Sequence, residues 1–170
     1  MRITAVEGDI TRQDVDVVVN AANSGMRGGG GVDGAIHRAG GPAILADCVE
    51  RFPHGLPTGA AGWTTAGDLP ARWVVHVAGP NYRAGQRDPD LLASCYREAM
   101  RLADELGART IAFPAVSAGI YGWPLEDAAR IAVTTVAEAG ADSAVEEARF
   151  VLFGEATNRV FADLVARLPG

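Results

Sequence analysis

The sequence predicts an α/β domain in which helices cover both faces of a mixed, mostly parallel sheet of about six strands, a three-layer α/β/α sandwich. Short β-branched runs alternate with helical patterns along the chain, as expected for a largely parallel sheet. Two runs, Val17–Val19 and Val74–Val77, are almost wholly apolar, which is typical of strands covered on both faces. The 170 residues fit one compact unit better than two, so we expect a single domain over residues 1–170.

Six segments have the length and composition of strands: 3–7, 15–20, 61–65, 73–78, 110–114 and 149–153. The helices are easier to recognise. One begins after Asp88, a helix-capping residue type, with Pro89 in its first position, and ends at Gly107. Another is predicted from Pro124 to Ala139 by its apolar stripe. Two shorter helices are predicted at 32–39 and 42–51, and a last helix turns Phe161, Leu164, Val165 and Leu168 toward the core.

Composition excludes several function classes. The net charge of -6 argues against a nucleic-acid partner held by phosphate contacts. All 15 basic residues are arginine, which excludes a Walker-type phosphate loop and a lysine Schiff base. Cys48 and Cys95 provide neither a disulfide framework nor a metal-ligand spacing. No apolar run approaches the ~20 residues of a membrane span. The chain starts in a strand-like segment instead of a signal peptide, so we expect a cytoplasmic protein.

Two glycine-rich loops follow predicted strands, at the carboxyl ends where open α/β sheets bind ligands. The first contains Asn20-Ala21-Ala22-Asn23 and then Gly28-Gly29-Gly30-Gly31, and the second runs from Ala115 to Gly122. Backbone N–H groups in such loops, with a helix N-terminus behind them, bind phosphate without a cationic side chain. The pair therefore predicts a diphosphate held between the loops. The alternative is that each is a tight turn that needs glycine, although four consecutive glycines are costly to order.

The polar residues beside the first loop each have two interpretations. Asn20 and Asn23 could bind sugar hydroxyls or could satisfy backbone groups of the turn. Asp33, at the start of a predicted helix, could cap that helix or could activate a water beside the ligand. His37 lies one turn further along the same helix face, where we expect local packing or hydrogen bonding.

Residues near other strand ends are similarly open. Asp9 could accept a hydrogen bond from an exocyclic amine such as that of adenine, or it could cap the turn at Thr11–Asp14. Phe153 could stack on a base or close the core. His76 lies in an apolar strand and is expected to be an interior histidine with satisfied hydrogen bonds.

Together these segments resemble the macrodomain family, of the MacroD type. The resemblance is carried by Asn20–Asn23 with the glycines and Val32–Gly41, by Phe113–Pro124, by Gly8–Thr11 and by Leu69–Pro80. They occur in the order and spacing of the family over nearly the whole chain, whereas 151–158 matches only loosely.

The resemblance implies an ADP-ribose site whose diphosphate is held mainly by backbone N–H groups. These would belong to Gly31, Val32, Ser117, Gly119 and Ile120. Adenine would be bound by Asp9 and the Ile10 N–H, with Phe153 against the ring and Asn158 nearby.

The distal ribose would lie against Asn23, Asp33 and Tyr121, of which Asn23 and Asp33 would be catalytic. The implied reactions are removal of mono-ADP-ribose from acidic side chains of proteins and deacetylation of O-acetyl-ADP-ribose. Both are ester hydrolyses without metal or cofactor, in which either Asp33 or a substrate phosphate oxygen activates the water. The implied partners are ADP-ribosylated proteins linked through Glu or Asp, and nucleic acid only as an ADP-ribosylated end.

Three other functions are considered. A non-catalytic ADP-ribose reader would share every binding residue. A dinucleotide oxidoreductase is suggested by Gly29, Gly31 and Gly34, but these glycines lie too far beyond the strand for the tight turn of that fingerprint. A serine hydrolase centred on Ser117 is rejected, because no histidine follows it in the chain.

Overall fold

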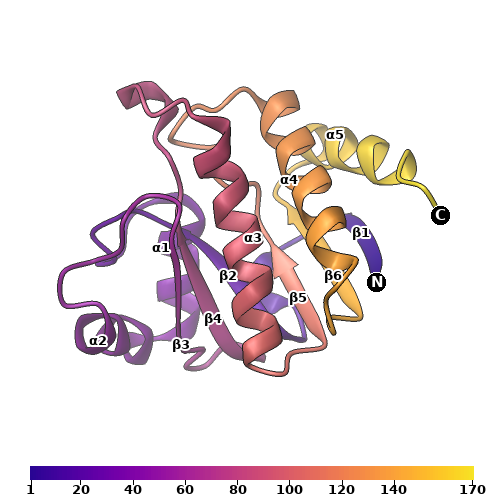
Figure 1. Ribbon diagram of the computed structural model, residues 1–170. Coiled ribbons are helices and arrows are strands. Elements are labelled where there is room, and N and C mark those ends of the chain that lie inside the picture. Colours follow the sequence, from indigo (N-terminus) through magenta and orange to yellow (C-terminus); the bar gives the residue numbers. More distant parts are fainter.

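The computed structural model describes residues 1–170 and contains one six-stranded sheet with the order β1-β6-β5-β2-β4-β3 (Figure 1). Only β3 runs antiparallel to its neighbour. The strands are β1 Arg2–Glu7, β2 Val15–Ala22, β3 Ala61–Thr65, β4 Ala71–Ala78, β5 Thr110–Phe113 and β6 Glu147–Leu152. The α-helices are α1 Gly31–Gly40, α2 Pro42–Arg51, α3 Pro89–Glu105, α4 Leu125–Gly140 and α5 Glu155–Ala166.

Helices cover both faces of this sheet, which confirms the predicted three-layer sandwich. Alternate residues of β2 point to opposite faces, as the strand period of two requires. Val17 and Val19 join the larger core cluster, beneath α3, α4 and α5. Val18 joins the smaller cluster, where Ile36 of α1 and Ile44 of α2 pack. In Figure 1, α3 and α4 cross one face while α1 and α2 lie beyond the other.

Every predicted element is present, but some boundaries differ. β4 begins at Ala71, two residues before the prediction, and β2 continues to Ala22. β6 ends at Leu152, which leaves Phe153 outside the strand. The helix α5 begins at Glu155, six residues before Phe161, the first of the core-facing residues by which it was predicted. The apolar stripe marks only the second half of that helix, because its first half faces solvent more than the core.

Parallel pairing brings the predicted loops together. Val17 and Val18 of β2 pair with Ile111 and Ala112 of β5, so the carboxyl ends of these strands are neighbours. β6 and β1 lie next in the order and end at the same edge. The segments after β1, β2, β5 and β6 therefore share one edge of the sheet. None of the helices is long and apolar enough to span a membrane.

Candidate active site

The glycine loop ends at the N-terminus of α1, and no side chain caps that helix. Gly30 is the N-cap residue, and Gly31 has φ +59, a left-handed conformation that favours glycine. Four N–H groups of a first helical turn lack intrahelical partners, and here no capping side chain competes for them. The sequence predicts that an anion binds at this helix start, and its backbone N–H groups are free of side-chain caps.

The second loop contains a serine in a strained conformation. Ser117 has φ +64 and is 7% exposed, and its buried hydroxyl has no hydrogen-bond partner. Gly79 permits this position, because a Cβ there would lie 2.7 Å from Ser117 Oγ. A buried hydroxyl without a partner is unfavourable unless a ligand or water satisfies it, which supports a ligand contact at this point.

A tyrosine that we did not predict holds the start of the same loop. The Tyr96 hydroxyl donates to the Pro114 carbonyl at 3.3 Å and accepts from the Val116 N–H at 3.0 Å. Tyr96 belongs to α3 and is 1% exposed, so the loop is fixed to the core immediately before Ser117. The only signal in the sequence is an aromatic residue next to the buried stripe of this helix.

The two loops touch through Ile120. Its Cδ1 lies 3.2 Å from the position that a Cβ on Gly30 would occupy, and 3.7 Å from that on Gly31. Ile120 is nevertheless 64% exposed. An exposed apolar side chain of the second loop therefore borders the start of α1, at the place where the resemblance implies a diphosphate.

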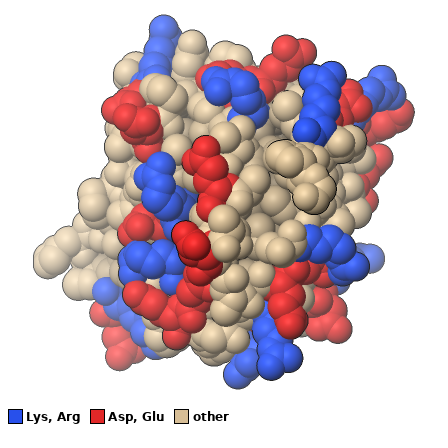
Figure 2. All heavy atoms as spheres, turned by 45° about the vertical axis from the view of Figure 1, so that its right-hand side comes forward, with Lys and Arg blue, Asp and Glu red and all other residues tan.

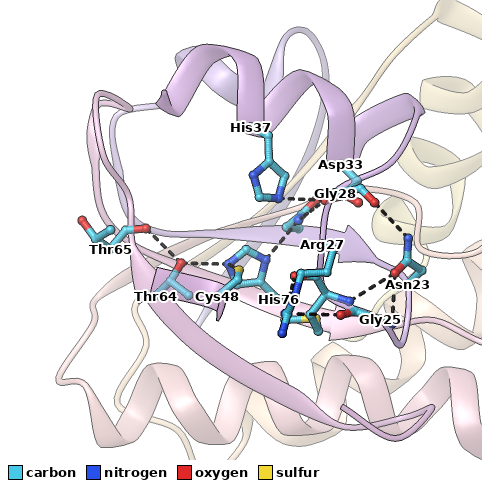
Figure 3. Close-up of polar contacts among 12 residues, drawn as sticks. Asn23, Gly25, Arg27, Gly28, Asp33, His37, Cys48, Thr64, Thr65 and His76 are labelled. Atoms are coloured by element: carbon cyan, nitrogen blue, oxygen red, sulfur yellow. Dashed lines mark hydrogen bonds and ion pairs between the residues drawn. The ribbon is translucent and has the colours of Figure 1, made fainter. Parts of the chain in front are cut away.

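Asp33 is the most buried acid of this region, at 5% exposure (Figure 3). Its Oδ1 accepts a hydrogen bond from Asn20 Nδ2 at 2.7 Å and lies 3.3 Å from His37 Nε2. The expected local bonding of His37 is thereby confirmed. Asp33 Oδ2 faces the glycine loop, because a Cβ on Gly29 would lie 3.2 Å from it. One carboxylate oxygen is thus held by the protein while the other borders the loop.

Asn20 has no exposed surface, which corrects the expectation that its amide meets a sugar hydroxyl. Its Nδ2 contacts Asp33 and also lies 3.1 Å from His76 Nδ1. His76 is 1% exposed, as expected for an interior histidine, and burial followed by the nearby His37 lowers its pKa to about 3. Asn20 therefore acts within the protein, behind Asp33.

Asn23 satisfies backbone groups of its own turn, which is one of the two interpretations given above. Its Oδ1 accepts from the N–H groups of Gly25 and Met26, and its Nδ2 donates to the Gly28 carbonyl. The residue is half-buried, and its Nδ2 would lie 3.4 Å from a Cβ on Gly29. Asn23 and Asp33 therefore border the same glycine, and a direct role of Asn23 with the ligand stays a prediction.

Tyr121 follows Ile120 and lies near the same acid. Burial, and after it the negative charge of Asp33, raise the pKa of the Tyr121 hydroxyl. Asp33 is near enough to act electrostatically on this hydroxyl, but no hydrogen bond joins the two side chains, which are 88 positions apart in the chain. Gly119, two residues before Tyr121, is exposed, and a Cβ on it would meet no atom within 4 Å.

The residues assigned to adenine lie at the ends of β1 and β6. Asp9 caps a short 3-10 turn, with its Oδ1 accepting from Thr11 N at 2.9 Å and Thr11 Oγ1 at 2.6 Å. These hydrogen bonds lower the Asp9 pKa, yet its side chain remains 52% exposed. Ile10 is buried in the turn, and Phe153 is 93% exposed, which corrects the alternative that it closes the core. Asn158 of α5 has a buried Oδ1 without a partner.

A pocket of about 350 Å³ lies behind the glycine loop, lined among others by Arg27, His37 and Arg38. On the face in Figure 2, acidic and basic side chains alternate and no continuous basic area forms. The structure has no group of three or more His, Cys, Asp or Glu side chains that could hold a metal ion.

Comparison with known proteins agrees with this geometry. The Macro domain family matches residues 19–132. A macro domain-containing protein of Streptomyces coelicolor is 62% identical over 164 residues, covering 94% of this chain and 96% of that protein. An O-acetyl-ADP-ribose deacetylase of Escherichia fergusonii is 48% identical over 170 residues, covering 98% and 96%.

Solved structures agree as well. The Trypanosoma brucei macrodomain in complex with ADP-ribose superposes with a TM-score of 0.90 at 40% identity, covering 96% of this chain and 69% of that one. The Oceanobacillus iheyensis macrodomain with ADP gives a TM-score of 0.89 at 37% identity, covering 95% and 88%. The sequence and the fold therefore agree, and the chain belongs to the macrodomain family.

Proposed function

We propose that this macrodomain binds ADP-ribose and hydrolyses ADP-ribosyl esters, either mono-ADP-ribose on acidic side chains of proteins or O-acetyl-ADP-ribose. The observation that carries the proposal is the Asp33 carboxylate. It is 5% exposed, one oxygen is held by Asn20, and the other borders the glycine loop that starts α1. A carboxylate oxygen directed at the loop can accept a proton from a water held there. The deacetylase relative and the ADP-ribose complex named above support the substrate class.

The diphosphate is assigned to the two facing loops. The uncapped first turn of α1 offers backbone N–H groups and the positive end of the helix dipole. The Ser117 hydroxyl lies buried without a partner in the opposite loop, with Gly119 and Ile120 after it. Such a site needs no lysine, and it reconciles a protein of net charge -6 with an anionic ligand.

The distal ribose is assigned to the space bordered by Asn23, Asp33 and Tyr121. Asn23 and Asp33 border Gly29, and Tyr121 follows Ile120 in the second loop. Adenine is assigned to the other end of the loops. The exposed ring of Phe153 offers a surface for stacking, and Asp9 keeps its carboxylate accessible to an exocyclic amine.

In the reaction, water adds across the ester bond between the distal ribose and the acyl group. Asp33 accepts one proton from this water as its oxygen attacks, and the ester C–O bond then breaks. The same proton is returned to the departing oxygen, so that the products are a carboxylic acid and a free hydroxyl on ADP-ribose. A substrate phosphate oxygen is the alternative proton acceptor, and it would leave Asp33 to orient the water.

Asp33→Asn tests the assignment with little change in shape. An amide can still accept the Asn20 hydrogen bond, but it cannot take a proton from water. We expect kcat for release from a glutamate-ADP-ribosylated protein to fall about 100-fold or more. The ADP-ribose Kd should stay within about tenfold, or 1.4 kcal/mol, by calorimetry.

Asp142→Asn is the matched control, because this aspartate is exposed beyond α4 and far from the loops. Full turnover by the Asp33 variant would contradict its role as the base and would favour the substrate phosphate. Binding without any turnover by the wild-type chain, on both the protein ester and O-acetyl-ADP-ribose, would instead identify a reader.

A further inference from the structure

We propose that Thr64 and His76 are positioning residues for Asp33, acting through Asn20 by a buried chain of hydrogen bonds. The inference rests on the proposed function, because it assigns these residues to the orientation of the reacting carboxylate. Thr64 lies on β3 and His76 on β4, the two strands that follow β2 at the edge of the sheet, and both side chains are buried.

The hydrogen-bond chain from Thr64 through His76 and Asn20 to Asp33 is continuous and almost without exposed surface. Thr64 Oγ1 lies 2.8 Å from His76 Nε2, and His76 Nδ1 lies 3.1 Å from Asn20 Nδ2. The same Nδ2 lies 2.7 Å from Asp33 Oδ1. Thr64 and Asn20 are 0% exposed and His76 is 1% exposed. The strand register explains the contact, since Asn20 of β2 pairs directly with His76 of β4.

The direction of each hydrogen bond follows from the number of hydrogens. Thr64 Oγ1 has one hydrogen and lies 2.9 Å from the Thr65 carbonyl, which can only accept. The Thr64 oxygen must then accept from His76, so Nε2 carries the imidazole hydrogen. Nδ1 is left as an acceptor for one Asn20 N–H, and the other N–H of the same amide points to Asp33.

The opposite tautomer would disturb this order. A hydrogen on His76 Nδ1 would face the amide nitrogen of Asn20, and two donors cannot pair. Rotating the Asn20 amide by half a turn would then place its oxygen against the Asp33 carboxylate. It would also put the amide nitrogen where Oδ1 now lies buried without a partner, leaving two donors unsatisfied in place of one acceptor. The threonine hydroxyl thus selects the tautomer, and the tautomer orients the amide that holds Asp33.

The ionisation of the buried groups is compatible with this chain. Burial lowers the pKa of His76 to about 3, so the imidazole is neutral wherever the enzyme would work. Cys48, whose Sγ lies 3.7 Å from His76 Nε2, has a pKa raised to about 11 by burial and stays a thiol. Apart from Asp33, the hydrogen-bond chain therefore contains no charged residue.

The first test determines the tautomer of His76 in the wild-type protein. The protein has three histidines, His37, His54 and His76, so two-bond ¹H–¹⁵N spectra can be assigned by substituting one at a time. We expect His76 to be neutral with its hydrogen on Nε2 throughout the neutral range. A hydrogen on Nδ1 would overturn the proposal.

The second test is Thr64→Val, which keeps the shape and removes the acceptor for Nε2–H. We expect a population with the hydrogen on Nδ1 and a fall in kcat of about tenfold, as for other residues that orient a reacting group through a hydrogen bond. The ADP-ribose Kd should be unchanged, because Thr64 is fully buried. Thr64→Ser restores a hydroxyl and should recover the tautomer and most of kcat. Cys48→Ala changes the same neighbourhood without removing a link of the chain and should leave the tautomer unchanged.

The outcomes separate this proposal from the proposed function. A Thr64→Val protein with the shifted tautomer and wild-type kcat would overturn the positioning role. Equal losses in the Val and Ser variants would also overturn it, since they would reflect packing. If the wild-type protein binds ADP-ribose but hydrolyses no ester, the proposed function fails. In that case the tautomer of His76 alone tests the hydrogen-bond chain. A hydrogen on Nε2 supports the orientation of Asn20 and Asp33 by this chain, and a hydrogen on Nδ1 overturns it.

Discussion

The buried histidine predicts how the stability of this protein depends on pH. His76 is 1% exposed, and burial is the first cause of its lowered pKa, with the nearby His37 as the second. The unfolded chain exposes the same imidazole, whose ordinary pKa is 6.5. Below that pH the imidazole binds a proton in the unfolded state, whereas in the folded state it stays neutral down to about pH 3. Stability from this group is thus complete above the unfolded pKa and is lost progressively as the pH falls.

The magnitude follows from the two pKa values. Each unit of difference is worth about 1.4 kcal/mol. The pH of 5 lies about 1.5 units below the pKa of the unfolded imidazole, while the folded imidazole is still neutral. The free energy of unfolding is therefore lower at pH 5 than at pH 7 by about 2 kcal/mol. The carboxyl groups with lowered pKa values, Asp9, Asp127 and Glu147, act below their ordinary values of 3.8 to 4.5 and hardly contribute in this interval.

The assay is urea unfolding at pH 7, 6 and 5, with the slope of the transition fixed across the series. We expect the free energy of unfolding of the wild-type protein to fall by about 2 kcal/mol between pH 7 and 5. His76→Asn lacks the titrating group, and its free energy should change by much less over the same interval. His54→Asn is the control. His54 is exposed, so this variant should keep the pH dependence of the wild-type free energy of unfolding. A His76→Asn protein with the wild-type pH dependence would refute the reasoning.

Three other changes have expected outcomes. Phe153→Ala removes a ring that is 93% exposed, so the free energy of unfolding should change by less than about 0.5 kcal/mol. The ADP-ribose affinity should fall by about 1–2 kcal/mol in calorimetry, and an unchanged affinity would exclude stacking on this ring. Tyr96→Phe leaves the Val116 N–H without a partner and should cost about 1–3 kcal/mol in urea unfolding, whereas a neutral change would show that the hydroxyl does not hold the loop. Gly34→Ala places a Cβ 2.7 Å from the Gly29 carbonyl, so the glycine loop must shift. Its ADP-ribose Kd should rise about tenfold or more, and an unchanged Kd would show that the loop tolerates the shift.

Local patterns in the sequence predict much of this fold. The apolar stripes and end signals of α3 and α4 are short-range, and the apolar runs of β2 and β4 identify strands covered on both faces. The glycine loops could be placed at one edge because parallel strands end together. The start of α5 was missed, since its first turns show no apolar periodicity.

The site was less predictable, because its decisive contacts join distant segments. Asn20 lies next to a loop in the sequence, yet the pairing of β2 with β4 places its amide between Asp33 and His76. The link from Tyr96 to the second loop spans 20 positions, and no local pattern indicates it. Asp33 could be named from its place after the glycines, but its burial and its partners are consequences of packing.

The most direct test of the account is single-turnover hydrolysis by the wild-type protein of a glutamate-ADP-ribosylated target and of O-acetyl-ADP-ribose, with the ADP-ribose Kd measured on the same sample. The account predicts saturable binding and release of free ADP-ribose from at least one ester, without added metal, and loss of release in Asp33→Asn. Binding with no release from either ester would contradict the hydrolase assignment, and the absence of binding at millimolar ADP-ribose would contradict the ligand site itself.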